Sequence, residues 1–131
     1  MAEKDVVRTD RAPGPFQGAP YNQAIRVGDL VFVAGQLGIA LETGALAGPG
    51  VAEQTEQIMR NLGAILEAAG SGLDSLVKTT VFLMDLADFQ GMNEVYAKHV
   101  GENRPARSTI GVAALPSGAL VEIEAIATVS T

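Results

Sequence analysis

The side chain best placed for chemistry in this sequence is an arginine near the C-terminus. Arg107 follows Pro105-Ala106 at the start of a largely uncharged stretch, with no acidic residue beside it. A guanidinium held in such a position offers a planar fork of donors that fits a carboxylate, which makes Arg107 a candidate for binding an acidic substrate. A structural ion pair is the alternative, and position alone leaves both open.

Two glutamates form the second candidate group. Glu122 and Glu124 share one face of the last predicted strand, a setting in which glutamate is normally depleted. The pair is either functional or part of a strand face that is solvated or paired with cations. The pattern leaves these two interpretations open.

Several other chemistries lack the residues they need. The chain has no cysteine, which excludes disulfides, thiolate metal sites and cysteine nucleophiles. Its one histidine, His99, falls in the last turn of a predicted helix, where we expect it to satisfy carbonyls or face water, and a single histidine disfavours a zinc site. No phosphate-binding loop or dinucleotide fingerprint is found.

Length and charge limit the kind of protein. The 131 residues suit one domain, with no room for a second. Nine Lys and Arg against fifteen Asp and Glu give a net charge of −6 with no basic cluster, which disfavours nucleic acid as a partner. No apolar stretch approaches the roughly 18 residues of a membrane span, and the start of the chain is charged, so we expect a cytoplasmic protein without membrane contact.

The first half of the chain predicts an arm, a hairpin, a loop and a helix. Residues 1–20 are rich in Pro and Gly and form an extended N-terminal arm. Residues 24–27 and 30–34 are β-branched runs joined by Gly28-Asp29, which indicates a hairpin. Residues 35–50 hold five glycines and form a loop with a short strand at 37–40. From Val51, apolar residues at helical spacing predict a helix that Gly70 ends.

The second half predicts a strand, a helix and a second hairpin. Residues 76–84 are apolar on both faces, as in a sheet interior. Asp85 can cap a helix whose apolar stripe runs from Phe89 to Val100. Residues 107–115 and 120–129 then form two strands around a turn at 116–118.

This order of elements predicts an α+β fold, a single-layer mixed β-sheet backed by two helices. Such a helix layer covers one face of the sheet and leaves the other bare. The bare face and the low charged fraction of 18% indicate that copies of the chain cover part of its surface.

The sequence also carries a family resemblance. Five segments, which follow one another in order and cover the chain from about Tyr21 to its end, are similar to successive signatures of the RidA/YjgF family: APYNQA at 19–24, VGDLVFVAGQ at 27–36, VKTTVF at 77–82, RPARS at 104–108 and VEIEAIA at 121–127. Each segment alone is a weak signal, whereas together they are highly specific.

The resemblance implies a fold, a reaction and an assembly. It implies a chorismate-mutase-like homotrimer with three clefts between subunits. The implied reaction is the hydrolysis of reactive imines and enamines of small 2-amino acids to 2-oxo acids and ammonia, without a cofactor or metal. The partners are then small 2-imino and 2-oxo acids and further copies of the same chain.

The resemblance also implies site residues. Arg107 grips the substrate carboxylate, Glu122 orients water, Gly35 makes a backbone contact, Tyr21 and Asn93 line the cleft, and the backbone N–H of Thr109 faces the substrate. Two positions depart from the family, because many members have Cys at position 109 and Ser at position 34, where this chain has Ala34. The backbone N–H at 109 survives that change, while the hydroxyl at 34 is lost.

A geometric argument bears on how such a site is assembled. If the last hairpin turns about Ser117, Glu122 lies opposite Val112, which is roughly 16 Å along the strand from Arg107 at ~3.3 Å per residue. The two side chains then cannot meet within one chain, and we expect the site to combine strands from two subunits.

Two other functions compete with the deaminase. A non-catalytic trimeric module could sense small carboxylates through the same Arg107 clefts. RNA cleavage or translation inhibition, roles attached to some family members, are disfavoured by the acidic charge and the absence of a basic patch.

Overall fold

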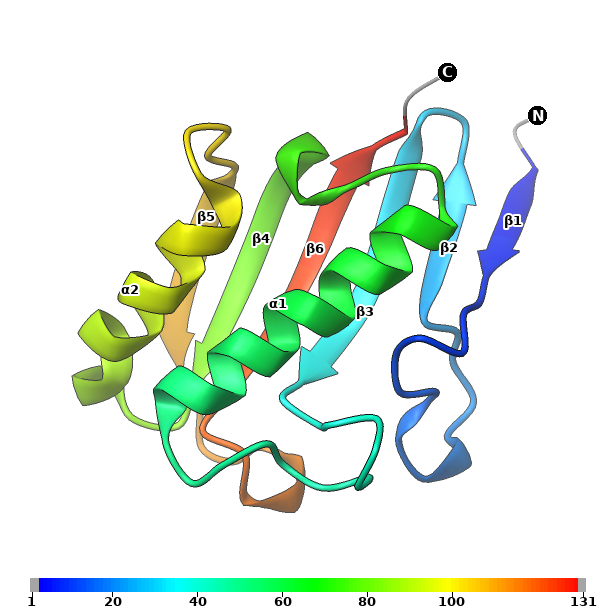
Figure 1. The fold of residues 1–131 in the computed structure, drawn as a ribbon. Coiled ribbons are helices and arrows are strands. Elements are labelled where there is room, and N and C mark those ends of the chain that lie inside the picture. Colours follow the sequence, from blue (N-terminus) through cyan, green and yellow to red (C-terminus); the bar gives the residue numbers. More distant parts are fainter. Residues whose placement is uncertain (1–2, 130–131) are drawn as a thin grey trace.

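The computed structural model describes residues 3–129, which form a mixed six-stranded sheet with two helices on one face (Figure 1). The strands are β1 (Lys4–Val7), β2 (Ala24–Val27), β3 (Leu30–Leu37), β4 (Leu76–Leu83), β5 (Ala106–Gly111) and β6 (Val121–Thr128). The helices are α1 (Val51–Ala68) and α2 (Phe89–Val100). The predicted α+β architecture is confirmed.

The strand order is β1-β2-β3-β6-β4-β5, in which β4 and β5 are parallel and all other neighbours are antiparallel. The predicted first hairpin is confirmed, with Val27 opposite Leu30 across a turn in which Gly28 has φ +59°. Its second strand runs to Leu37, and beyond it an isolated bridge joins Ile39 to Leu46 where we predicted a short strand.

The predicted second hairpin is wrong. β5 pairs with β4 through the α2 crossover, and β6 inserts between β3 and β4. Burial explains this order, because β6 alternates buried Val, Ile and Ala with its glutamates, whereas β5 (ARSTIG) has no fully buried residue. A polar strand suits a sheet edge, and an apolar one suits the centre.

The N-terminal arm contributes a strand that the sequence analysis did not predict. β1 pairs with β2 and forms the other edge of the sheet. The arm then turns back at Phe16–Gly18 before it reaches Tyr21.

The helices form where the apolar spacing predicts them. The stripe of α1 is fully buried against β3 and β6 and includes Ile58, Leu62 and Ile65. Asp85 acts as a cap as predicted, but it caps the 3-10 turn that precedes α2 and not α2 itself: its carboxylate accepts a 2.9 Å hydrogen bond from the Ala87 N–H. Within residues 3–129, no helix combines the length and hydropathy of a membrane span.

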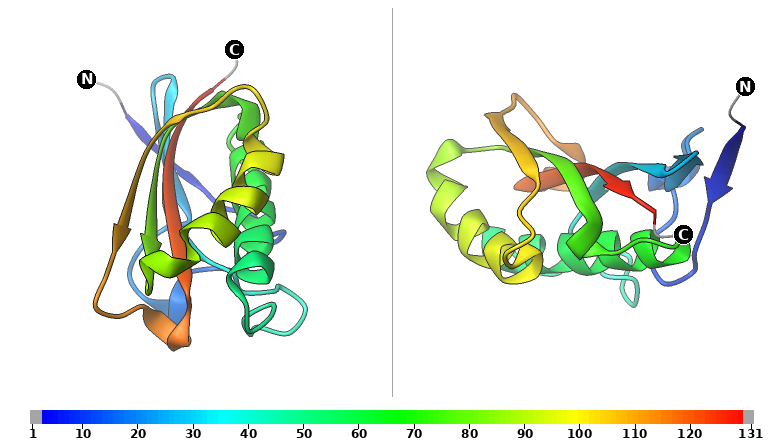
Figure 2. Two further views of the ribbon diagram at one scale, coloured as in Figure 1. Left: turned by 90° about the vertical axis from the view of Figure 1, so that its left-hand side faces the viewer. Right: turned by 90° about the horizontal axis from the view of Figure 1, so that it is seen from above.

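Both helices cover the same face of the sheet, as the side view in Figure 2 shows. A cross-strand row on the opposite, bare face consists of Val6, Ile25, Phe32 and Ile126, and Val6 and Phe32 are 50% and 43% exposed. Large apolar side chains thus lie exposed on the face that the helices leave uncovered. The prediction of a bare face is therefore confirmed.

Candidate active site

The predicted site residues fall into two groups within one chain. Tyr21, Gly35 and Glu122 line a cavity of about 1090 Å³. Arg107 and Thr109 lie on β5, beside the α2 helix that carries Asn93. The structure therefore brings the residues together as two partial sites.

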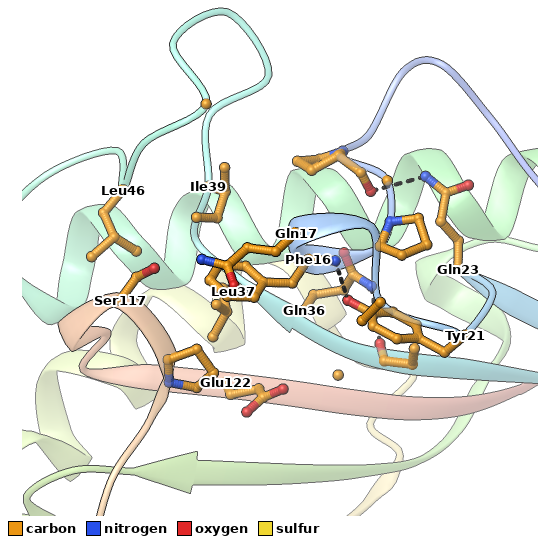
Figure 3. A pocket seen from close by; sticks show the side chains of 18 of the residues that line it. Phe16, Gln17, Tyr21, Gln23, Gln36, Leu37, Ile39, Leu46, Ser117 and Glu122 are labelled. Atoms are coloured by element: carbon orange, nitrogen blue, oxygen red, sulfur yellow. Dashed lines mark hydrogen bonds between the residues drawn. The ribbon is translucent and has the colours of Figure 1, made fainter.

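The cavity lies where the N-terminal arm, the end of β3 and the start of β6 meet (Figure 3). The loop at 44–46 and the turn at 116–117 complete its walls. Apolar side chains predominate, with a few polar groups among them, which is the usual composition of a small-molecule site. Glu122 supplies the carboxylate.

A hydrogen bond from the backbone fixes the position of the Tyr21 hydroxyl. The phenol oxygen accepts a 2.6 Å hydrogen bond from the Phe16 N–H, so the phenol proton is left to donate to a ligand. The ring is 41% exposed along the cavity.

Gln23 fixes the arm that carries Tyr21. Its amide is buried and donates to the carbonyls of Thr9, Ala12 and Pro13, while its oxygen accepts from the Thr9 N–H at 2.8 Å. Sequence reasoning missed this role, although Gln23 belongs to the APYNQA segment. A buried glutamine beside a Pro-rich arm was the available signal.

Gly35 leaves space for Glu122. β3 is irregular between Val33 and Gln36, and a Cβ atom at position 35 would overlap the Glu122 carboxylate. Glycine therefore allows the carboxylate to lie against the β3 backbone. Ala34, one of the two departures from the family, also lines the cavity.

The Glu122 carboxylate is half-buried, and burial raises its pKa above the ordinary glutamate value. The neighbouring charge of Glu124 raises this pKa further. A carboxyl group with a raised pKa can take up and return a proton closer to neutral pH. Glu122 is therefore suited to acid–base chemistry in the cavity.

Arg107 lies against two aromatic rings of α2. Its Cζ atom is 4.9 Å from the centroid of the Tyr96 ring and 5.5 Å from that of Phe89. Within residues 3–129 the ion pairs join Arg11 to Glu67 and Glu56 to Arg60 and His99, so the structural ion pair considered for Arg107 is not formed there. Its guanidinium is a cation seated on aromatic faces.

Asn93 adds an acceptor to this second group. It lies one helical turn from both Phe89 and Tyr96, on the face of α2 that Arg107 contacts. Its Oδ1 atom is buried and has no hydrogen-bond partner in the described part of the chain. A buried acceptor of this kind is suited to a ligand N–H. Thr109 lies two residues beyond Arg107, on the same face of β5.

The two groups lie on opposite faces of the sheet. Arg107 pairs with Thr79 and Glu122 with Phe82, and positions three apart on β4 point to opposite sides. Three residues along β4 and two strand spacings separate their Cα atoms by roughly 14 Å. They are indeed apart within one chain, but the register that led to this prediction, with Glu122 opposite Val112, is wrong.

Comparison with known proteins shows the family to which the chain belongs. Residues 11–129 match the family described as Endoribonuclease L-PSP, the family of RidA and YjgF. The chain belongs to this family. The resemblance found in the five sequence segments is thereby confirmed.

Named members of the RidA/YjgF family are similar over most of the chain. Reactive Intermediate Deaminase A, chloroplastic, of Arabidopsis thaliana is 51% identical over 126 residues, which cover 96% of this chain and 66% of that protein. Human 2-iminobutanoate/2-iminopropanoate deaminase is 44% identical over 93% of this chain and 88% of its own length. The crystal structure of RidA from a Psychrobacter species superposes with a TM-score of 0.90 at 44% identity, over 95% and 99% of the two chains.

His99 has a structural role in this member of the RidA/YjgF family. Its Nε2 atom lies 2.9 Å from Oε1 of Glu56, and this contact links α2 to α1. The prediction that His99 satisfies backbone carbonyls or faces water is therefore wrong, because its partner is a glutamate side chain. This hydrogen bond lowers the pKa of Glu56. Neither residue contributes to the cavity or to the Arg107 group.

Proposed function

We propose that this protein hydrolyses the reactive imines and enamines of small 2-amino acids to 2-oxo acids and ammonia. The observation that carries the proposal is Arg107, whose guanidinium rests on two rings without a carboxylate partner among residues 3–129. Such a group is suited to the carboxylate of a 2-imino acid. The names of the human and Arabidopsis relatives support the same reaction.

The reaction needs few parts. Arg107 binds the substrate carboxylate, and the Asn93 Oδ1 accepts a hydrogen bond from the imine N–H. Glu122 holds a water molecule and takes its proton as the water oxygen bonds to the imine carbon. Transfer of this proton to nitrogen gives a carbinolamine, which carries a hydroxyl and an amino group on the same carbon. The hydroxyl proton then passes through Glu122 to the amino group, the C–N bond breaks as the C=O bond forms, and the products are ammonia and a 2-oxo acid.

Tyr21, Gly35 and Thr109 complete this scheme. The phenol proton of Tyr21 stabilises developing charge from the cavity side. Gly35 keeps the Glu122 carboxylate in place, and the Thr109 N–H contacts the substrate carboxylate. Neither a cofactor nor a covalent nucleophile enters any step.

The site proposed here forms between subunits of a homotrimer. Arg107, Asn93 and Thr109 come from one subunit, and Tyr21, Gly35 and Glu122 from its neighbour. The separation of the two groups on opposite sheet faces and the exposed apolar row of Val6 and Phe32 support this assembly. Light scattering after size-exclusion chromatography that shows a monomer at micromolar concentration would exclude it.

The compartment proposed for this enzyme is the cytoplasm. The Arabidopsis relative is chloroplastic, so members of the family work in more than one compartment. Fractionation of the source cells, with detection of the protein by antibody, tests the assignment.

A turnover assay tests the reaction. A threonine or serine dehydratase generates 2-iminobutanoate or 2-iminopropanoate in situ, and loss of the imine is followed by its ultraviolet absorbance. We expect the wild type to accelerate this loss and Arg107→Ala to abolish the acceleration. No acceleration by the wild type, combined with saturable binding of 2-oxobutanoate, would favour the carboxylate sensor instead.

A further inference from the structure

The Tyr96 and Phe89 rings form a seat for the Arg107 guanidinium, at 4.9 Å and 5.5 Å from its Cζ atom. Tyr96 is buried in the core, whereas Phe89 is 38% exposed, so core packing alone does not explain the aromatic ring at position 89. We propose that Tyr96 and Phe89 are positioning residues that orient Arg107 for carboxylate binding. The inference rests on the proposed function, because it concerns the same site.

Aromatic faces hold a cation in a way that a carboxylate cannot. A carboxylate partner would occupy the guanidinium N–H groups and would compete directly with an acidic substrate. The ring quadrupole attracts the cation and leaves the N–H groups free for a bidentate ligand. The seat therefore limits the rotamers of a long side chain on an edge strand without neutralising its charge.

The Tyr96 ring is itself held in place by a hydrogen bond to β4. Its hydroxyl lies 2.6 Å from Oγ1 of Thr79, and both residues are buried, at 5% and 0% exposure. Thr79 is also the register partner of Arg107 across β4 and β5. A continuous set of contacts thus runs from Thr79 through Tyr96 to the guanidinium. The hydrogen bond from β4 holds the Tyr96 ring in place, and the ring holds the Arg107 guanidinium in place.

The seat predicts a graded series of variants. Tyr96→Leu and Phe89→Leu each remove a ring, and we expect KM for the imine to rise about three- to tenfold with little change in kcat, since uniform binding is lost. Tyr96→Phe keeps the ring and loses the hydrogen bond to Thr79, so its effect on KM should be smaller. Phe89→Tyr should bind like the wild type, because it restores an aromatic face.

Binding tests the seat independently of turnover. Calorimetric titration with 2-oxobutanoate should give a Kd for Tyr96→Leu that lies between those of the wild type and Arg107→Ala. Ile65→Ala, a buried truncation on α1 in the stripe that packs against β3 and β6, serves as a control for general loss of stability. Because Phe89 is partly exposed, Phe89→Leu keeps the test available should Tyr96→Leu fail to fold.

The outcomes separate the two proposals. If the wild type binds 2-oxobutanoate without turning over imines, the deaminase is rejected while weakened binding by Phe89→Leu still supports the seat. If both leucine variants retain the wild-type Kd and KM while Arg107→Ala loses binding, Tyr96 and Phe89 are only structural and the inference is wrong.

Discussion

Arg107 and Glu122 lie on opposite faces of the sheet, separated by three positions along β4. A site that needs both must take them from different subunits. For the proposed homotrimer, we therefore expect chains carrying Arg107→Ala and chains carrying Glu122→Gln, each inactive alone, to regain activity when they assemble together. Random assembly at equal amounts restores about a quarter of the sites, since each site needs an intact residue from each neighbour.

The mixing experiment has an internal control. Chains that carry both substitutions, mixed with either single variant, leave no intact site and should stay inactive. Activity is measured after co-expression and also after mixing the purified trimers without exchange. If co-expressed single variants remain inactive although mass spectrometry shows mixed trimers, the site is not shared between subunits.

Alanine substitutions at two glycines distinguish a loss of activity at the candidate site from a loss of stability of the fold. A Cβ atom at Gly35 meets the movable Glu122 side chain, whereas one at Gly38 lies 2.6 Å from the backbone oxygen of Gln54 on α1. Gly35→Ala should keep its melting temperature within a few degrees and lose at least about tenfold in kcat/KM. Gly38→Ala should lose about 2–3 kcal/mol of unfolding free energy, because backbone cannot move aside. Equal losses of stability in both variants would contradict this assignment.

The parts of the fold that sequence patterns predict are those in which local spacing decides. The buried stripe of α1 and the Gly28 turn are local, and both are confirmed. Strand order is not local, because alternation in β6 indicates which face is buried and not which strand lies beside it. The short turn at 116–118 therefore favoured a β5–β6 hairpin, although the polar character of β5 was the better guide to a sheet edge.

The candidate site shows the same division. The family segments contain Arg107, Glu122 and Tyr21, and the structure adds the contacts that hold them. Tyr96 and Phe89 read as ordinary core positions of a helix, since no sequence pattern shows that the guanidinium on β5 packs against α2. Their function depends on the β4–β5 pairing, which only the fold supplies.

Glu122 predicts a pH dependence. Burial raises its pKa first, and the charge of Glu124 raises it further. The ionised form takes the proton from water, so kcat/KM should fall as the pH drops through this pKa, above the ordinary glutamate range. Removing the neighbouring charge by Glu124→Gln lowers the pKa of Glu122, which should move the acidic limb to lower pH. The pH–rate profile measures this shift.

The control for this profile is Glu102→Gln, which removes an exposed carboxylate far from β6 in sequence and should leave the limb in place. A limb that moves to higher pH in Glu124→Gln would reverse the sign expected for two like charges. A limb that both variants leave unmoved would mean that another group titrates.

Gln23 predicts a link between the stability of the arm and the activity. Its buried amide makes hydrogen bonds to Thr9, Ala12 and Pro13, and the arm that it fixes carries Tyr21 into the cavity. Gln23→Ala leaves these backbone groups without partners, which should cost about 2–4 kcal/mol of unfolding free energy. We also expect the arm to be cut faster in limited proteolysis and kcat/KM to fall. Gln17→Ala changes an exposed amide of the same arm and should leave both stability and cleavage unchanged. Should Gln23→Ala lose stability while its cleavage rate and activity stay at wild-type values, the arm would hold Tyr21 in place without Gln23.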